Sequence, residues 1–196
     1  MYQLRMASGS DAEALLEIYN QYIDTSITFE YLLPDIEEFR QRIHRTLTQY
    51  PYFVAEKEGI PVGYGYAGRL KERAAYQWNA ELSVYIDRKQ VGCGLGKQIY
   101  RALLSMLKAQ NILTVYGCVT LPNPASQGLH QAMGFDLTGV WKKAGYKNET
   151  WYDVGWYQLQ IGDMHCTPKK VLTPAELDAD FIQKVLDGCL LYTSEE

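Results

Sequence analysis

The stretch VGCGLGKQIYRALL (residues 91–104) alternates three glycines with other residues, follows them with a lysine, and then adopts helical apolar spacing. A Walker loop would need a glycine in place of Val91 and a serine or threonine in place of Gln98. The dinucleotide fingerprint would need a glycine at Lys97 or at Ile99. What remains is a glycine-rich turn that opens a helix, whose free N–H groups can receive an anion.

The length of the chain, 196 residues, suits one α/β domain with a small appendage. Hydrophobic residues make up 47% of the sequence, enough to build a core. No apolar run approaches the roughly 18 residues that cross a bilayer. The N-terminus lacks the basic start and apolar stretch of a signal peptide. We therefore expect a cytoplasmic protein that does not act at a membrane.

Charge and metal-ligand chemistry narrow the function further. The formal net charge of −4 argues against nucleic-acid binding. The cysteines are scattered without the paired spacing of a metal site, which favours free thiols in a reducing compartment. The histidines are far apart, although His165 adjoins a cysteine, and no metal site is expected. The cysteines are Cys93, Cys118, Cys166 and Cys189.

Hydrophobic periodicity divides the chain into elements in the order β-α-α-β-β-β-α-β-α-β-β. Ser10 and Glu13 are the predicted capping box of the first helix, and Asp35 is the predicted cap of the second. The predicted strands are residues 2–7, 52–58, 60–69, 81–87, 112–120, 136–147 and 151–161, with helices starting near residues 14, 36, 95 and 126. This order predicts the α/β (α+β) class, a mixed sheet with helices on its faces.

The tail, residues 163–196, differs in character, and we expect it to extend a domain formed by residues 1–162. Thr173, Pro174 and Glu176 predict a helix start. The apolar face that follows consists of Leu177, Phe181, Ile182, Val185 and Leu186, and Gly188 ends the helix. This amphipathic helix must pack on its own domain or across a dimer.

An ordered set of motifs, over roughly residues 2 to 161, resembles the GNAT superfamily of acyl-CoA N-acyltransferases. Within this superfamily, the motifs more specifically resemble those of the phosphinothricin and methionine-sulfoximine acetyltransferase branch. The motifs are IYNQYI with TFE, ERAAYQWNAELSVYID, GLGKQIYRALL, LPNPASQGLHQAMGF and AGYKNETWYDVGWYQ. The resemblance implies the GNAT fold with a mostly antiparallel sheet, acetyl-CoA as co-substrate, and a homodimer. It also implies that the anion at the glycine turn is the diphosphate of coenzyme A.

The resemblance assigns the residues that would hold this co-substrate. Backbone N–H groups of the turn would bind the diphosphate, because glycine allows close approach. Strand 81–87 would donate an N–H near Val84 or Tyr85 to the thioester oxygen, and Asn123 would bind the pantetheine arm, although Asn before Pro124 also commonly starts a turn. The remaining residues assigned to the co-substrate are Val91, Gly92, Cys93, Gly94, Leu95, Gly96, Lys97 and Ser126. Val91 departs from the family pattern, which usually has arginine or glutamine there, so the contact that this long polar side chain makes with the co-substrate is in question. The binding of the diphosphate by backbone N–H groups is not affected.

Two residues carry the predicted chemistry. Glu81 matches the family carboxylate that faces the acceptor amine, and an ammonium must lose a proton before it can attack. The alternative for Glu81 is an ordinary surface ion pair. His130 lies where many GNAT enzymes have a tyrosine that protonates the departing thiolate, and histidine is a plausible acid there. The alternative is a packed, hydrogen-bonded histidine without proton transfer.

The residues expected to bind the acceptor follow from the same resemblance. Arg73 can clamp a carboxylate or phosphinate in bidentate fashion, next to Tyr76. Phe29 and Tyr31 would form a wall of the pocket, and Lys147 would close it. Each assignment has an alternative. Arg73 could be an ordinary surface arginine, Phe29 and Tyr31 could simply cover the core, and Lys147 could be a solvated charge at a strand end.

The sequence thus favours an N-acetyltransferase that acts directly on the primary amine of a small amino-acid-like acceptor, of the phosphinothricin or methionine sulfone and sulfoximine type. A second reading keeps the fold and acetylates proteins or peptides. A third reading is a non-catalytic acyl-CoA sensor or interaction module. An enclosed pocket favours the first reading, and an open groove favours the second.

Overall fold

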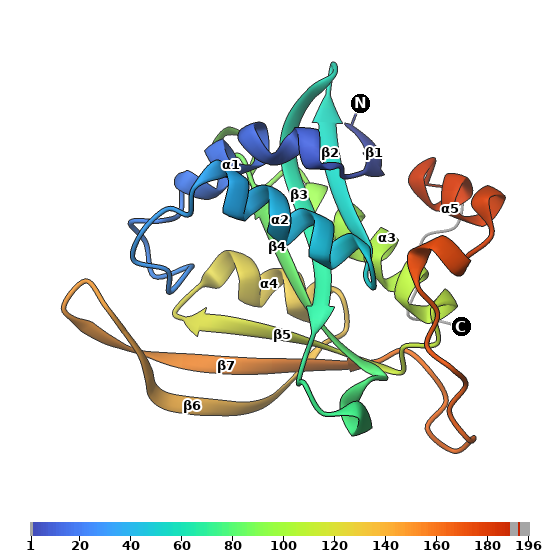
Figure 1. The fold of residues 1–196 in the computed structure, drawn as a ribbon. Helices are drawn as coiled ribbons and strands as arrows, with labels where there is room; N and C mark the ends of the chain where they lie inside the picture. Colours follow the sequence, from blue (N-terminus) through green and yellow to red (C-terminus); the bar gives the residue numbers. More distant parts are fainter. Residues whose placement is uncertain (1, 189–191, 193–196) are drawn as a thin grey trace.

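The computed structural model describes residues 2–188 and residue 192. Its centre is a seven-stranded sheet in the order β1-β2-β3-β4-β5-β7-β6 (Figure 1). The strands are β1 (Tyr2–Met6), β2 (Tyr52–Lys57), β3 (Ile60–Arg69), β4 (Asn79–Ile86), β5 (Thr114–Leu121), β6 (Asp136–Lys147) and β7 (Thr150–Gln160). All neighbouring strands are antiparallel except β4 and β5. The predicted mixed, mostly antiparallel sheet is confirmed.

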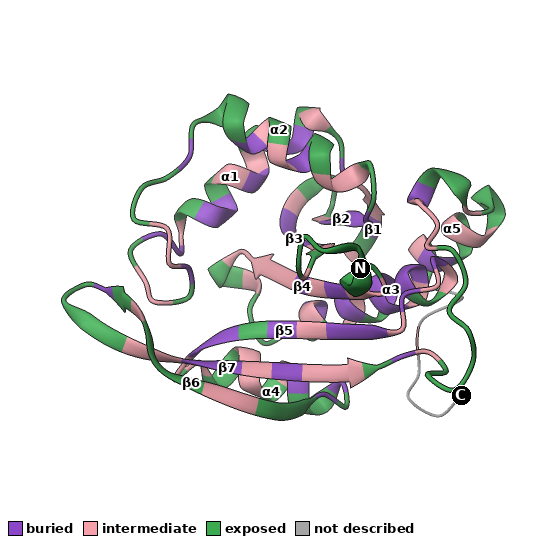
Figure 2. Ribbon diagram, turned by 60° about the horizontal axis from the view of Figure 1, so that its bottom comes forward, coloured by how far each residue is buried: buried purple, intermediate pink, exposed green. Residues whose placement is uncertain are grey.

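Helices cover both faces of the sheet. On one face, α1 (Ala12–Asn20) and α2 (Ile36–Leu47) form a core with alternate residues of β2 and β3. On the other face, the core is built around α3 (Leu95–Ala109), with α4 (Pro124–Ala132) farther along. Buried residues accordingly gather on α3 and β5 (Figure 2). The approach of α3 to β3 requires Gly65, because a Cβ there would lie 2.4 Å from a side-chain carbon of Ile99.

The parallel pair β4 and β5 separates along its length. Pairing runs from Asn79 with Thr114 to Glu81 with Tyr116 and goes no further. Beyond this point β4 keeps its antiparallel partner β3, and β5 keeps its antiparallel partner β7. The facing edges of β4 and β5 therefore diverge and leave main-chain groups available to a ligand.

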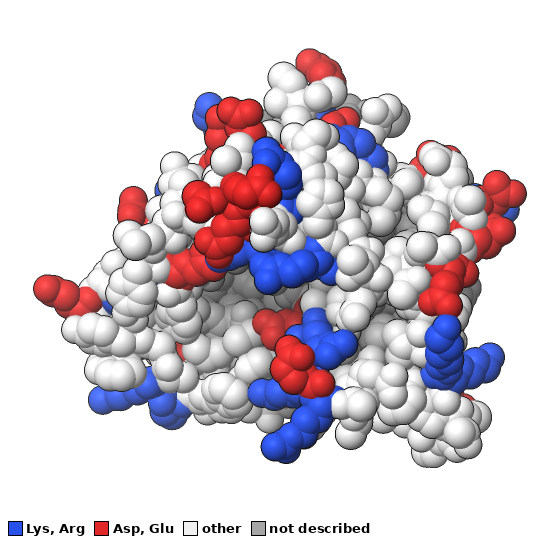
Figure 3. Space-filling view, viewed as in Figure 1, with Lys and Arg blue, Asp and Glu red and all other residues white. Residues whose placement is uncertain are grey.

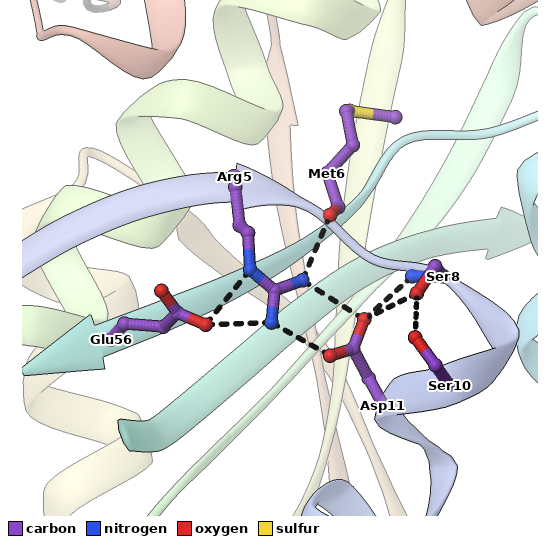
Figure 4. A network of polar contacts seen from close by, with 6 residues as sticks. All are labelled: Arg5, Met6, Ser8, Ser10, Asp11 and Glu56. Carbon is purple, nitrogen blue, oxygen red and sulfur yellow. Dashed lines mark hydrogen bonds and ion pairs between the residues drawn. The ribbon is translucent and has the colours of Figure 1, made fainter. Parts of the chain in front are cut away.

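The start of α1 is fixed by a polar network, not by the predicted capping box of Ser10 and Glu13, which is wrong. The box is formed two residues earlier, by Ser8 and Asp11, around the short helix Gly9–Asp11. Arg5 on β1 grips both carboxylate oxygens of Asp11, at 2.9 and 2.7 Å. Its Nε also donates to Glu56 on β2, at 2.8 Å (Figure 4). The network joins β1, β2 and the entry to α1.

Replacing Asp11 by Asn is expected to lower the free energy of unfolding by about 1–3 kcal/mol at pH 7, because it removes one of the two carboxylates that pair with the partly buried Arg5 guanidinium. Burial alone raises the pKa of Asp11, but hydrogen bonds from Arg5 and Ser8 outweigh it and lower the pKa overall. The contribution is therefore full above about pH 4, the ordinary aspartate pKa, and is lost as the pH falls through the folded-state value. Urea unfolding of the wild type and of Asp11→Asn at pH 7 and pH 3 measures this contribution. An equal difference in the free energy of unfolding between the two proteins at both pH values would contradict the prediction.

The C-terminal extension packs on the domain that precedes it. The predicted Thr173–Glu176 box is present, on the short helix Pro174–Glu176. The prediction of one continuous helix from this box is wrong, because the chain is extended at Leu177 and the helix α5 (Ala179–Leu186) starts separately with its own cap, Asp178. Val185 is fully buried in the α3 core, and Leu172 accepts a hydrogen bond from the buried side chain of Gln110 at 2.7 Å. The apolar face is thus covered by its own chain; residues 189–191 and 193–196, including Cys189, lie outside the described residues.

None of the helices within residues 2–188 is long and apolar enough to span a bilayer.

Candidate active site

The separation of β4 from β5 produces a cleft of about 460 Å³. Its walls are β4, β5, the glycine turn before α3, and the first turns of α4. Most residues predicted to hold the co-substrate line this cleft: Val84, Tyr85, Val91, Gly92, Gly94, Gly96, Lys97, Asn123 and Ser126. Cys93 and Leu95 do not. The Cys93 thiol bonds to the carbonyl oxygen of Gln90, at 2.7 Å, and the Leu95 side chain is buried in the core.

The glycine turn leaves the mouth of α3 open. Gly92 and Gly94 have φ values of +87° and +85°, so backbone geometry alone favours glycine at both. A Cβ at either position would meet nothing within 4 Å. Gly94 caps α3 without a side-chain hydrogen bond, and the next amides to be bonded are those of Lys97 and Gln98. The amides of the first helical residues are therefore left for an anion.

Strand alternation decides which β4 amide faces the cleft. In an antiparallel pair, each residue turns its N–H and C=O to the same side. The Asp87 amide donates to a carbonyl of β3 at 2.9 Å, so the Tyr85 amide, two residues earlier, also faces β3. Val84 and Ile86 then face the cleft, where the Ile86 carbonyl accepts the Tyr22 hydroxyl at 2.5 Å. Of the two predicted donors to the thioester oxygen, the geometry favours Val84.

Asn123 combines the two roles considered for it. Its side-chain oxygen caps α4 by accepting from the Ser126 amide at 3.2 Å. Its side-chain amide nitrogen remains available to the cleft that the residue lines. This cap makes α4 begin at Pro124 rather than near residue 126.

Glu81 lies at the vertex where β4 and β5 part. It shares a sheet face with Ser83 and Tyr85, on the side of α1 and α2. Burial raises the pKa of Glu81, and Lys71 opposes this shift. No ion pair of Glu81 occurs among the described residues, so the surface-pair alternative finds no support there. Glu81 itself does not line the cleft, but it directly precedes Leu82 and Ser83, which do. A carboxylate with a raised pKa at this position has the character of a general base.

His130 is packed against the opposite side of the cleft. Its ring is only 2% exposed and stacks on Tyr157, with centroids 4.9 Å apart. Nδ1 must donate to the Ser126 carbonyl at 2.8 Å, so Nε2 is the acceptor for the Tyr100 hydroxyl at 3.2 Å. Burial lowers the pKa of His130, against the effect of the Ser126 hydrogen bond. The side chain is thus held as a neutral imidazole, and its role as an acid stays a prediction.

A second cavity, of about 320 Å³, lies between α2 and the sheet. Its walls are Tyr19, Phe39, Tyr52, Tyr64, Tyr66 and Tyr85, with Glu30, Arg42, Arg45 and Thr46. We call it the tyrosine cavity. Tyr85 also borders the cleft, so the two spaces adjoin. Figure 3 shows a hollow on the α2 face, with basic side chains above it and both acidic and basic side chains below it.

The residues predicted to bind the acceptor line neither cavity. Lys147 is 2% exposed, and its ammonium donates to the carbonyls of Ile23 and Thr28, each at 2.6 Å. Tyr31 donates to the Tyr146 carbonyl, and Phe29 packs against Gly145. These side chains fasten the loop between α1 and α2 to the β6–β7 hairpin. Phe29, Tyr31 and Lys147 were predicted to contact the acceptor directly. In the structure they instead hold in place the loop that forms one wall of the site.

Arg73 and Tyr76 lie on the exposed loop that leads into β4. The structure places neither against a described acidic partner or within the tyrosine cavity. Lys71, on the same loop, is the cation that acts on Glu81. Lys71 was not predicted as a site residue; the signal for it in the sequence is its place two residues before Arg73.

Within the described residues, no group of three or more potential metal ligands is present.

Comparison with known proteins agrees with this geometry. A family model described as an acetyltransferase (GNAT) domain matches residues 4–156. The chain belongs to the GNAT acetyltransferase family. It is 38% identical over 170 residues to the phosphinothricin N-acetyltransferase of Streptomyces viridochromogenes, covering 86% of this chain and 92% of that protein. It is 29% identical to the L-methionine sulfoximine/L-methionine sulfone acetyltransferase of Pseudomonas aeruginosa, covering 84% and 98%.

A crystal structure of a GNAT phosphinothricin acetyltransferase from Sinorhizobium meliloti, in complex with acetyl-CoA, superposes with a TM-score of 0.84. The two chains are 30% identical over 90% of this chain and 97% of that one. The predicted fold, enzyme class and family branch are thereby confirmed. The chain is a GNAT N-acetyltransferase.

Val91 provides a test of the glycine turn in this GNAT chain. Its side chain is 52% exposed and lines the cleft. Replacing it with Gln adds amide N–H donors beside the expected diphosphate, so acetyl-CoA should bind roughly three- to tenfold more tightly. Isothermal titration calorimetry measures this, with Val91→Leu as the apolar control. Equal affinities in the two variants would contradict placement of the diphosphate at this turn.

Proposed function

We propose that this GNAT enzyme transfers the acetyl group of acetyl-CoA directly to the primary amine of a small amino-acid-like acceptor of the phosphinothricin or methionine sulfone and sulfoximine type. The observation that carries the proposal is the position of Glu81 where β4 and β5 part, on the sheet face that Tyr85 and the stacked tyrosines share. The cleft suits an extended thioester arm, and the bounded cavity of about 320 Å³ suits a small acceptor.

Residues of this chain divide the chemistry between them. When bound, acetyl-CoA supplies the acetyl group as a thioester. The amides at the start of α3 and the Lys97 ammonium hold the diphosphate. The Val84 amide donates to the thioester oxygen, where negative charge grows as the amine attacks. Glu81 accepts a proton from the acceptor ammonium and so frees the nitrogen lone pair.

Two further groups bear on the departure of the thiolate. His130 is the predicted proton donor, and it can serve only after Nε2 has gained a proton, because Nδ1–H is held by Ser126. Cys118 also lines the cleft. Although Cys118 is exposed on the cleft wall, desolvation by the surrounding protein and the Glu81 charge raise the pKa of its thiol to about 12, so it is protonated at neutral pH and is a poor nucleophile. This supports direct transfer without an acyl-cysteine.

A thiol-release assay tests the proposal over amino acids, their sulfone and phosphinate analogues, polyamines and peptides. Coenzyme A should be released fastest with methionine sulfone, methionine sulfoximine or phosphinothricin, and mass spectrometry should detect the N-acetyl product. Release mainly with peptides would favour the protein N-acetyltransferase reading. Binding of acetyl-CoA without turnover on any of these amines would favour the sensor.

We also propose a homodimer located in the cytoplasm. The exposed aromatic side chains Trp141, Tyr146 and Trp151 on the β6–β7 hairpin would suit a subunit contact. Light scattering after gel filtration measures the mass, and a monomer at micromolar concentration would contradict the dimer.

A further inference from the structure

The tyrosine cavity has a chemical character beyond its size, and this character selects among acceptors; the inference rests on the proposed function. Tyr52, Tyr64 and Tyr66 present near-parallel rings, tilted by no more than 20° to one another. Cross-strand pairing produces this stack. Tyr52 on β2 lies opposite Tyr66 on β3, and Tyr64 is two residues from Tyr66 on β3, so all three side chains are on the same sheet face. The phenol groups therefore project from one sheet face toward α2.

The hydroxyls of Tyr52 and Tyr64 are free to bind a ligand. Neither hydroxyl has a hydrogen-bond partner among the described residues, and neither is among the polar atoms sealed from solvent. Both side chains are otherwise buried, with 3% and 1% exposure, so the hydroxyls open onto the cavity. Burial holds the pKa of each phenol well above its usual value of 10. The groups stay protonated at physiological pH and can donate.

Charges around the cavity complete an array of donors. Arg42 forms ion pairs with Glu30, at 2.6 Å, and with Glu38, at 2.5 Å. Arg45 forms no ion pair with a described residue, and its Nε makes a long contact of 3.4 Å to the Gln41 carbonyl. Arg45 therefore contributes a guanidinium that is not held in an ion pair, and its charge balances the second carboxylate of the Arg42 cluster. The Tyr52 and Tyr64 hydroxyls and the Arg45 guanidinium are all hydrogen-bond donors, so together they suit a ligand group that accepts several hydrogen bonds.

The cavity is placed to receive the acceptor side chain. Glu81 and Ser83 lie on the same face of β4, about 7 Å apart at two residues' spacing, and Ser83 is opposite Tyr66. An acceptor with its amine at Glu81 can therefore extend its side chain along β4 toward the stacked tyrosines. We propose that the tyrosine cavity binds the distal end of the acceptor side chain. The Tyr52 and Tyr64 hydroxyls and the Arg45 guanidinium select a side chain that ends in acceptor oxygens, such as a sulfone, sulfoximine or phosphinate.

The test compares methionine sulfone with methionine, which has the same chain and lacks the oxygens. The measured quantity is the ratio of kcat/KM values for sulfone over methionine. In Tyr64→Phe, which removes one hydroxyl and keeps the ring, the ratio should fall roughly tenfold, the usual effect of one hydrogen bond to a bound group. In Arg45→Gln the ratio for phosphinothricin over methionine should fall at least as far, because its phosphinate is charged.

Tyr50→Phe is the matched control. Tyr50 is also a buried tyrosine, but it belongs to the core around α3 and lies outside the cavity. The ratio should be unchanged in this variant. An unaltered ratio in both Tyr64→Phe and Arg45→Gln, with a wild-type enzyme that acetylates both amino acids, would overturn the assignment and leave the proposed function standing. A wild-type enzyme that acetylates no amino acid would instead overturn the proposed function and this assignment with it.

Discussion

Replacing Glu81 by Gln is expected to lower kcat by about 10²–10⁴-fold, the usual range for loss of a general base. The affinity for acetyl-CoA should change by less than threefold, because the diphosphate and thioester contacts lie elsewhere. Stopped-flow thiol release measures the first quantity and calorimetry the second. A kcat within threefold of the wild type would remove Glu81 from the chemistry.

The stability of this variant separates a catalytic loss from a folding defect. Burial raises the folded-state pKa of Glu81, so the ionised carboxylate opposes folding at pH values above its unfolded pKa. Glutamine does not ionise, and Glu81→Gln should therefore melt at the same temperature as the wild type or slightly higher at pH 7. A fall in Tm of several degrees would point to a structural role.

Glu81 also sets the expected pH dependence of the wild-type enzyme. Only the ionised form can accept the proton, so kcat/KM should fall as the pH drops through a pKa above the ordinary glutamate value of about 4.3. Residual activity in Glu81→Gln should lack this acidic limb. If kcat/KM of the variant still fell over the same acidic pH range, the fall would have to come from a group other than Glu81.

Placing a negative charge in the glycine turn is the second large perturbation. Gly96→Asp is expected to weaken acetyl-CoA binding by about 30–300-fold, because a carboxylate next to the bound diphosphate adds roughly 2–3 kcal/mol of repulsion. The same substitution should not weaken the fold. A Cβ at Gly96 lies 3.4 Å from the nearest Leu129 carbon, an ordinary contact, and an acidic residue in a first helical turn is favourable.

Gly96→Asn separates charge from bulk in this experiment. Its side chain has almost the same size, so any loss that it shares with Asp comes from crowding of the backbone cradle. Asn should weaken acetyl-CoA binding much less than Asp does. Thermal shifts with and without acetyl-CoA check both variants, since binding to the native state alone raises Tm. Equal losses for Asn and Asp would exclude an electrostatic cradle.

Local patterns predicted most of the fold, because they report which face of each element is buried. The 3.6-residue spacing in α2, α3 and α5 agrees with the structure, and β2 and β3, predicted as a hairpin, pair as one and are buried on both faces. The capping box failed for a nonlocal reason. The segment from Ser8 to Glu13 contains two overlapping boxes, and the choice between them is made by Arg5 on β1, which grips Asp11.

The site was predictable where the main chain forms it. The glycine turn and the parting of β4 from β5 depend on backbone conformation, which glycine spacing and strand order indicate. The acceptor side was less predictable, because it requires the register between strands. Tyr52, Tyr64 and Tyr85 look like packing residues until pairing brings them to one cavity. Lys147 looks like a solvated charge until the loop carbonyls of Ile23 and Thr28 surround it.

The most direct measurement is a crystal structure of the protein grown with acetyl-CoA. The diphosphate should accept hydrogen bonds from the amides at the start of α3. The pantetheine arm should run between β4 and β5, with the thioester oxygen on the Val84 amide and the acetyl carbon toward Glu81. Density for acetyl-CoA at any other place, or a closed β4–β5 edge in crystals that contain it, would contradict the account.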